Sequence, residues 1–148
     1  MIYIGIDPGK RGGLAVIADG HPWVAKFDKE TYQRVLSQVR RSGAVCTIEK
    51  VGARPEQGVT SMFHFGENYG WIQGILDANG IRYTAVAPQT WKKALGVTAD
   101  KQTSIAECKR LFPETNLVPP KCRTEHDGIA EALLLAEYGR RQFYGKKR

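Results

Sequence analysis

Short apolar runs separated by turn residues predict five β-strands along this chain. The first run, residues 2–7 (IYIGID), is apolar throughout and ends on an acid. Asp19-Gly20 stands between the second and third runs, and this pair is typical of a tight hairpin turn. The chain is therefore expected to open with a three-stranded antiparallel meander. The predicted strands are residues 2–7, 12–19, 22–27, 44–49 and 81–87.

Apolar residues at helical spacing predict helices between and after these strands. In residues 28–41, for example, Tyr32, Val35 and Leu36 recur on one face, and Gly43 follows as a stop. Asp100 is expected to cap the helix that it begins. Residues 59–79 contain several glycines, which are expected to interrupt the helix there. The predicted helices are residues 28–41, 59–79, 88–95, 100–112 and 124–143.

The order of these elements indicates an α/β fold. The strand–helix–strand segment 44–87 implies parallel neighbours joined by a right-handed crossover. We therefore expect a mixed five-stranded sheet, antiparallel in its first three strands, with helices on both faces. A length of 148 residues without repeats or linkers fits one domain, residues 1–148.

Charge and composition narrow the class of partner. The net charge is +7, which is typical of proteins that meet a polyanion such as nucleic acid, although charge alone names no reaction. No apolar run is long enough to cross a membrane, and the N-terminus lacks a signal-peptide pattern, so a cytoplasmic location is expected. The cysteines form no CxxC pair and are expected to be free thiols: Cys46, Cys108 and Cys122.

Two predicted strands end on an acid, Asp7 after IYIGI and Glu49 after AVCTI. If the strands are neighbours, both carboxylates reach the same edge of the sheet, where they repel each other unless a cation lies between them. Mg²⁺ prefers such oxygen ligands. A turn at Asp7-Pro8-Gly9 is an alternative interpretation of the first acid.

The last predicted helix adds two more acids. Asp127 and Glu131 are four residues apart and so share a helix face, while Gly128, Ala130 and Ala132 are small enough to let that helix approach the sheet. Four acids would suit two Mg²⁺ ions about 4 Å apart, and Mn²⁺ is expected to substitute. Asp127 also follows Thr124 at the spacing of a capping box, and Glu131 is alternatively a solvated helix residue.

The ordered set of motifs resembles the RuvC-type Holliday junction resolvases of the ribonuclease-H-like superfamily, particularly the short phage-like members. The resemblance covers about residues 2–138. Its motifs are Gly5-Ile6-Asp7-Pro8-Gly9, Thr47-Ile48-Glu49, Pro88-Gln89-Thr90-Trp91-Lys92-Lys93, Asp100-Lys101 and His126-Asp127-Gly128-Ile129-Ala130-Glu131-Ala132-Leu133.

The resemblance implies a metal site and catalytic lysines. Asp7 and Glu49 match the first two metal-binding acids of the family, and Glu131 matches the last. The family places the third acid three residues before the last one, where this chain has Gly128. Asp127 is displaced from that place by one residue, and His126 is the alternative. Lys101 matches a lysine of the active site, and Lys92 or Lys93 matches a second; alternatively, they contact phosphate or solvent.

The resemblance further implies a metal-dependent endonuclease that cuts branched DNA as a homodimer and leaves 5′-phosphate ends. Residues 59–79 would form the dimer element, and their aromatic residues would pack there, enter the junction centre or join the core: Phe63, Phe65, Tyr69 and Trp71. Basic residues are expected to contact DNA: Lys10, Arg11, Lys50, Arg54, Lys92 and Lys93. The alternatives are a related nuclease for structured RNA and a non-catalytic junction-binding protein.

Overall fold

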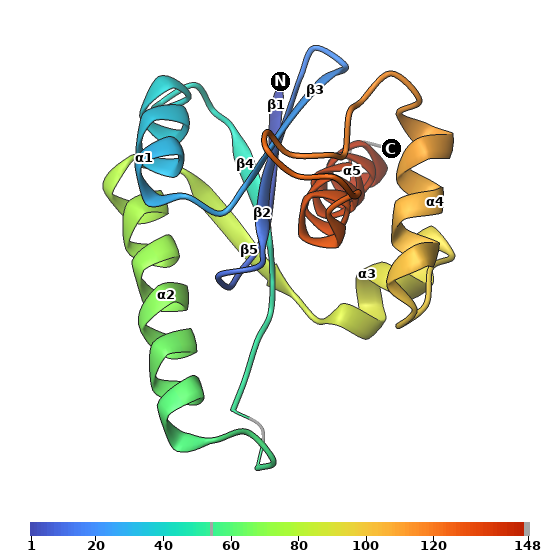
Figure 1. Ribbon diagram of the computed structural model, residues 1–148. Coiled ribbons are helices and arrows are strands. Elements are labelled where there is room, and N and C mark those ends of the chain that lie inside the picture. Colours follow the sequence, from blue (N-terminus) through green and yellow to red (C-terminus); the bar gives the residue numbers. More distant parts are fainter. Residues whose placement is uncertain (54, 147–148) are drawn as a thin grey trace.

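A five-stranded sheet organises the computed structural model, which describes residues 1–53 and 55–146. The sheet has the strand order β3-β2-β1-β4-β5 (Figure 1). β2 pairs antiparallel with β1 and β3, whereas β4 pairs parallel with β1 and β5. This arrangement confirms the predicted mixed sheet. The strands are β1 (Ile2–Asp7), β2 (Gly13–Ala18), β3 (His21–Lys26), β4 (Val45–Glu49) and β5 (Arg82–Val86).

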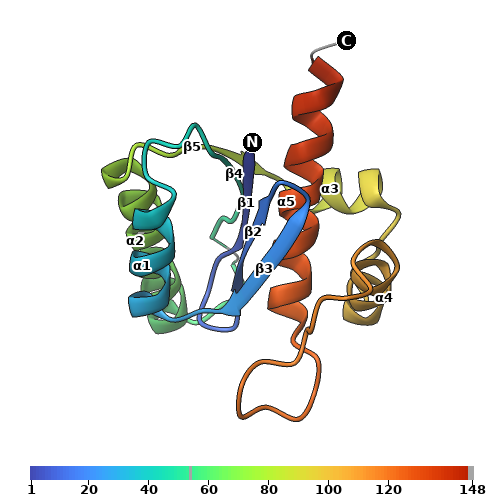
Figure 2. The same ribbon diagram turned by 90° about the horizontal axis from the view of Figure 1, so that it is seen from above.

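Helices cover both faces of the sheet, as predicted (Figures 1 and 2). One face carries α1 (Lys29–Gln38) and α2 (Val59–Ala78), and the other carries α3 (Pro88–Leu95), α4 (Lys101–Leu111) and α5 (Asp127–Lys146). Successive strand residues point to opposite faces. Ile4 and Ile6 therefore join the core under α1 and α2, whereas Tyr3 joins the core under α5.

The helix α5 lies unusually close to the sheet because glycines line the contact. A Cβ atom on Gly5 would lie 1.9 Å from the carbonyl oxygen of Ala132, and one on Gly13 would lie 2.7 Å from that of Gly128. No side chain fits between these backbones. The prediction that small residues bring the last helix close to the sheet is thus confirmed, and the first turns of α5 reach the end of β1.

Several turn and cap predictions are also confirmed. Asp19 and Gly20 have positive φ angles of 51° and 82°, as a tight hairpin turn requires. The side chain of Asp100 accepts a hydrogen bond from the backbone N–H of Gln102 at 3.0 Å and so caps α4.

Two predictions about helices are wrong. The helix α2 runs unbroken from Val59 to Ala78, because its glycines lower helix stability without blocking helical geometry. The helix α5 begins at Asp127 rather than at residue 124. Its start is capped by His126, whose Nδ1 accepts a hydrogen bond from the backbone N–H of Ile129 at 3.1 Å. Thr124 precedes the helix, so the capping-box interpretation fails.

The cysteines are free thiols, as predicted. Cys46 and Cys108 are buried free thiols, and Cys122 is an exposed one. Within residues 1–53 and 55–146, no helix has the length and apolar character needed to span a membrane.

Candidate active site and metal centre

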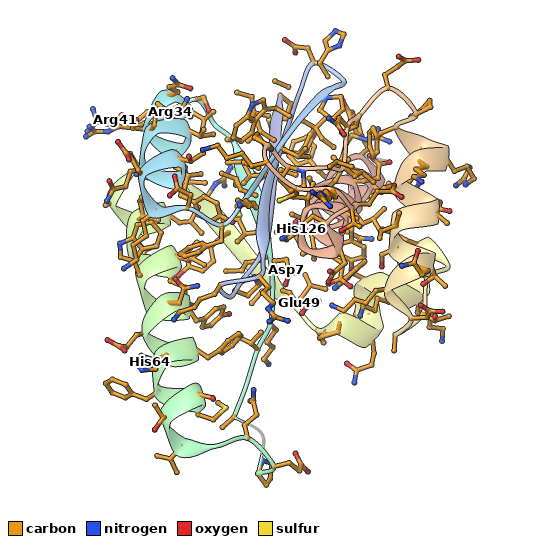
Figure 3. All side chains as sticks on the ribbon, in the orientation of Figure 1. Asp7, Arg34, Arg41, Glu49, His64 and His126 are labelled. Carbon is orange, nitrogen blue, oxygen red and sulfur yellow. The ribbon has the colours of Figure 1, made fainter. Side chains whose placement is uncertain are left out.

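Asp7 and Glu49 end two neighbouring parallel strands. The register pairs Ile6 of β1 with Ile48 of β4, so the acid that follows each residue arrives at the same edge of the sheet. Figure 3 shows the two side chains close together on the side of the sheet that faces α5. The prediction that these two carboxylates converge is therefore confirmed.

The helix α5 adds Glu131 and Asp127 to this edge. The side chain of Glu131 is only 3% exposed, whereas that of Asp127 is 43% exposed. Burial raises the pKa of Asp7 well above its ordinary value, and the nearby charges of Glu131 and Glu49 raise it further. Burial also raises the pKa of Glu49. The four acids thus form one electrostatically coupled group, which we call the acid cluster: Asp7, Glu49, Asp127 and Glu131.

Two lysines partly balance the acid cluster. Lys101 Nζ lies 3.0 Å from Asp127 Oδ2 and 3.7 Å from Glu131 Oε1. Lys92 Nζ also lies 3.7 Å from Glu131 Oε1. Burial lowers the pKa of Lys101, but the hydrogen bond to Asp127 and the charge of Glu131 outweigh it, and the pKa is raised. Lys101 therefore stays charged beside the acids.

The donor set fits a hard divalent cation. Glu131 Oε1 is buried, and the two lysines at 3.7 Å are too distant to hydrogen-bond to it, so it accepts no hydrogen bond from any described residue. Burying a carboxylate oxygen without a hydrogen bond is costly. A cation bound by oxygen ligands would satisfy it. As the side chains now lie, no three His, Cys, Asp or Glu residues in the described ranges form a metal-holding group. Lys101 lies between Asp127 and Glu131 instead, so metal binding by these acids would require it to move.

One residue of the site was not expected from the sequence to contact the acids. Trp91 is fully buried in α3, and its indole N–H donates a hydrogen bond to Glu49 Oε2 at 2.9 Å. Lys92 Nζ lies 5.5 Å from the centre of the same ring. A signal was present in the sequence. The motif PQTWKK follows the fifth strand directly, and β5 ends at the same edge as its parallel neighbour β4.

Gly128 stands where the sequence resemblance would place a third acid, and that position is closed to any side chain. A Cβ atom on Gly128 would lie 2.3 Å from the carbonyl oxygen of Arg11 and 2.8 Å from His126 Cε1. No side chain fits there, whatever its charge. The acid one residue earlier, Asp127, instead stands at the first position of α5, beside Lys101.

His126 caps α5 rather than joining the acid cluster. Its Nδ1 accepts the hydrogen bond from Ile129, and an acceptor nitrogen carries no proton. Burial lowers the pKa of His126, which favours this neutral form. Nε2 is therefore the ring nitrogen through which His126 would act on a ligand.

Comparison with known proteins identifies the fold of this chain. No family model matches the chain, and no curated protein matches it. Solved structures do match it, among them two structures of RuvC. RuvC from Thermus thermophilus in complex with a Holliday junction substrate has 20% sequence identity and a TM-score of 0.66. Another structure of Thermus thermophilus RuvC has 22% identity and a TM-score of 0.64. In both, the match covers 99% of this chain and 96% of the other. The chain has the ribonuclease-H-like fold.

Most of the cations expected to contact DNA are exposed, and three of them follow Asp7 or Glu49 closely in the chain. Lys10 and Arg11 follow Asp7 in the loop after β1, and Lys50 directly follows Glu49. Lys93 is exposed on α3, whereas Lys92 is largely buried beside Glu131. Arg54 lies outside the described residues.

The aromatic residues of α2 divide into two groups. Phe63 is 64% exposed, while Phe65 packs over Gly9 in the loop after Asp7. Tyr69 and Trp71 pack against the core between α2 and the sheet. Of these four side chains, Phe63 is thus the one displayed to solvent.

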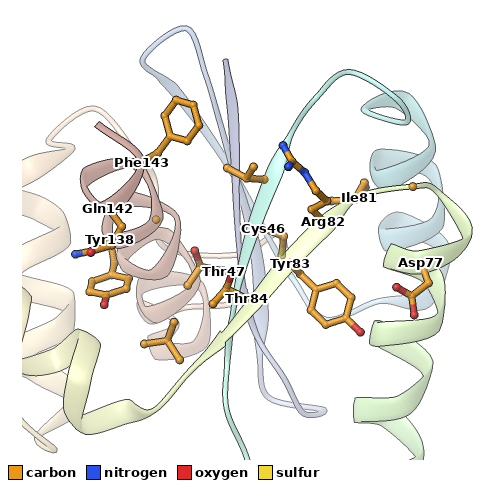
Figure 4. A pocket seen from close by; sticks show the side chains of 14 residues that line it. Cys46, Thr47, Asp77, Ile81, Arg82, Tyr83, Thr84, Tyr138, Gln142 and Phe143 are labelled. Carbon is orange, nitrogen blue, oxygen red and sulfur yellow. The ribbon is translucent and has the colours of Figure 1, made fainter. Parts of the chain in front are cut away.

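A hollow of about 940 Å³ lies along β5, away from the acid cluster. In Figure 4, Tyr138 and Gln142 of α5 line it on one side of the strand, and Tyr83 lies on the other side, toward α2. None of the four acids lines this hollow.

Proposed function

We propose that this protein is a divalent-metal-dependent endonuclease that hydrolyses phosphodiester bonds in branched DNA of the Holliday-junction type. The observation that carries the proposal is the acid cluster, with Lys92 and Lys101 beside it, at the ends of two parallel strands. The ribonuclease-H-like fold supports it, since one structure that matches nearly the whole chain is a RuvC in complex with a Holliday junction substrate.

The four acids would hold Mg²⁺, in two sites, with Mn²⁺ able to substitute. When bound, the metal neutralises the acids and stabilises the negative charge that develops on the phosphate. Asp7, Glu49 and Glu131 supply buried or half-buried oxygens, and Asp127 supplies an outer one. With metal held by the acids, Lys101 would donate hydrogen bonds to the scissile phosphate. The products would carry a 5′-phosphate and a 3′-hydroxyl.

The remaining cations would hold the DNA backbone around the scissile bond. Exposed lysine and arginine side chains bind phosphates without reading sequence, so recognition would depend on the shape of the junction. The residues proposed for this role are the exposed Lys10, Arg11, Lys50 and Lys93, together with Arg54 and the largely buried Lys92.

Paired cuts in a four-way junction require two active sites, so we propose a homodimer of single-domain chains acting in the cytoplasm. The helix α2 is the proposed dimer element, because its N-terminal part displays Phe63 to solvent.

The proposal is tested by cleavage of labelled substrates. With Mg²⁺, the protein should cut a four-way DNA junction and spare a linear duplex of the same sequence. Asp7→Asn should abolish cutting while junction binding persists. Cleavage of a structured RNA hairpin alone would overturn the DNA assignment, and junction cleavage at an unchanged rate in Asp7→Asn would overturn the metal centre.

A further inference from the structure

Trp91 joins the hydrophobic core to the acid cluster. Its ring is fully buried among residues of α3, α4 and α5, including Leu95 and Leu133. The one polar atom of this side chain, Nε1, points toward the acid cluster and donates a hydrogen bond to Glu49 Oε2 at 2.9 Å. A ring fixed by packing on all sides holds its N–H in one direction, so the carboxylate that accepts this bond is oriented by the core.

The chemistry of the donor suits a metal ligand. A carboxylate has two oxygens, and the hydrogen bond from Trp91 engages Oε2 and leaves Oε1 free for another partner. Indole is neutral, so it orients the acid without contributing a positive charge that competes with a cation. Lys101 differs in this respect, because its ammonium group lies where a cation would bind.

The ring also organises the neighbouring lysine. Lys92 Nζ lies 5.5 Å from the centre of the Trp91 ring, within the range of a cation–π contact, and 3.7 Å from Glu131 Oε1. One buried side chain thereby contacts both a carboxylate of the acid cluster and a lysine beside it.

We propose that Trp91 is a positioning residue of the metal centre: its indole N–H holds Glu49 Oε2 so that Oε1 faces a divalent cation, and its fluorescence reports the cation's arrival. The inference rests on the proposed function, because it assumes that Glu49 is a metal ligand. Groups that hydrogen-bond to a ligand from outside the site typically change metal affinity by about 10- to 100-fold.

The first test compares Trp91→Phe with Trp71→Phe by isothermal titration with Mn²⁺. Phenylalanine keeps an aromatic ring in the core but removes the N–H. We expect Trp91→Phe to bind Mn²⁺ about 10- to 100-fold more weakly than wild type. Trp71 packs against Phe27 and Tyr32 on the other face of the sheet, so its variant controls for loss of a large ring and should bind Mn²⁺ like wild type.

A merely structural role for Trp91 is excluded by a double variant. If Trp91 acts through Glu49, the weakening caused by Trp91→Phe should disappear in a Glu49→Ala background, where the acceptor is gone. A weakening of the same size in both backgrounds would mean that the substitution disturbs the site through packing, and would overturn the proposal.

A second measurement needs no substitution at Trp91, and so does not depend on the variant folding. In ¹⁵N-labelled wild type, the Trp91 indole N–H signal should shift on addition of Mg²⁺. The indole emission of a Trp23→Phe/Trp71→Phe double variant, in which Trp91 is the remaining tryptophan, should change with it. Mg²⁺ binding by calorimetry without either change would overturn the role of Trp91. Absence of any divalent-metal binding by wild type would instead overturn the proposed function.

Discussion

At the scale of single residues, Asp7 is a buried carboxylate beside other acids, and this environment disfavours its negative charge. Its pKa is raised well above the ordinary value by burial and by two neighbouring acids. Removing that charge should stabilise the metal-free protein. We predict that Asp7→Asn raises the melting temperature in EDTA at neutral pH by a few degrees, since about 1 kcal/mol corresponds to 2–4 °C at this size.

The control for this prediction is Glu114→Gln, because Glu114 is an exposed residue of the loop after α4, outside the acid cluster. Its melting temperature should not change. A lower melting temperature for Asp7→Asn in EDTA would mean that the carboxylate stabilises the fold and that repulsion within the acid cluster is not the dominant effect.

The pKa of Glu137 is shifted in the opposite direction to that of Asp7. Its side chain is buried, and Arg140 Nε and Arg141 Nε donate hydrogen bonds to it at 2.7 and 2.9 Å. Burial raises the pKa of Glu137, but these bonds outweigh burial and lower it below its ordinary value of 4.5. The stabilisation is therefore present above about pH 4.5 and is lost as the pH falls through the lower, folded-state value.

We predict that Glu137→Gln lowers the free energy of unfolding by about 1–3 kcal/mol at neutral pH, because the hydrogen bonds to a charged acceptor are removed. The difference from wild type should shrink as denaturant unfolding is repeated at progressively lower pH. A difference that stays constant from neutral pH to below the pKa of Glu137 would contradict a charge-based contribution.

At the scale of elements, the close contact of α5 with the sheet positions Glu131 and Asp127. A methyl group on Gly128 would meet backbone atoms of Arg11 and Gly12, which cannot rotate away. We predict that Gly128→Ala lowers stability by at least about 1–3 kcal/mol, the usual effect of overpacking, and lowers metal affinity as α5 shifts. Chemical denaturation and Mn²⁺ titration measure the two effects.

Gly74→Ala is the matched helical control. Gly74 lies within α2, and a Cβ atom there meets nothing within 4 Å. Alanine should therefore raise stability by up to about 1 kcal/mol through helix propensity alone. Equal behaviour of the two variants would contradict the account of the α5 contact.

The sequence predicts these elements unevenly, for physical reasons. Asp7 and Glu49 were predicted to meet because parallel neighbouring strands end at the same edge of a sheet. Apolar runs, turn residues and helical spacing predicted the strands and helices of the described residues. The hydrogen bond between Trp91 and Glu49 was not predicted, because it joins residues 42 positions apart through the packing of α3. The start of α5 was misplaced because Thr124 offers a familiar cap signal, whereas the structure uses the less common cap His126.

At the scale of the whole molecule, the net charge is +7, and only the cations close to the acid cluster should act on DNA. Lys10 and Lys50 are exposed in the loops that follow Asp7 and Glu49. Arg34 and Arg41 lie on and just after α1, far from the two acids in Figure 3. The two pairs carry the same charge and differ in their place, which makes them a matched comparison.

We predict that replacing Lys10 and Lys50 together by alanine weakens binding to a four-way junction and reduces the slope of log affinity against log salt concentration by about 2, near 0.9 for each phosphate that is no longer neutralised. Replacing Arg34 and Arg41 removes as much charge but should leave the slope unchanged, because neither arginine is expected to bind a phosphate of the junction. Fluorescence anisotropy of a labelled junction, titrated in EDTA over a range of salt concentrations, measures binding without cleavage. Equal reductions in the two double variants would show that diffuse positive charge attracts DNA and would contradict a DNA path over the acid edge of the sheet.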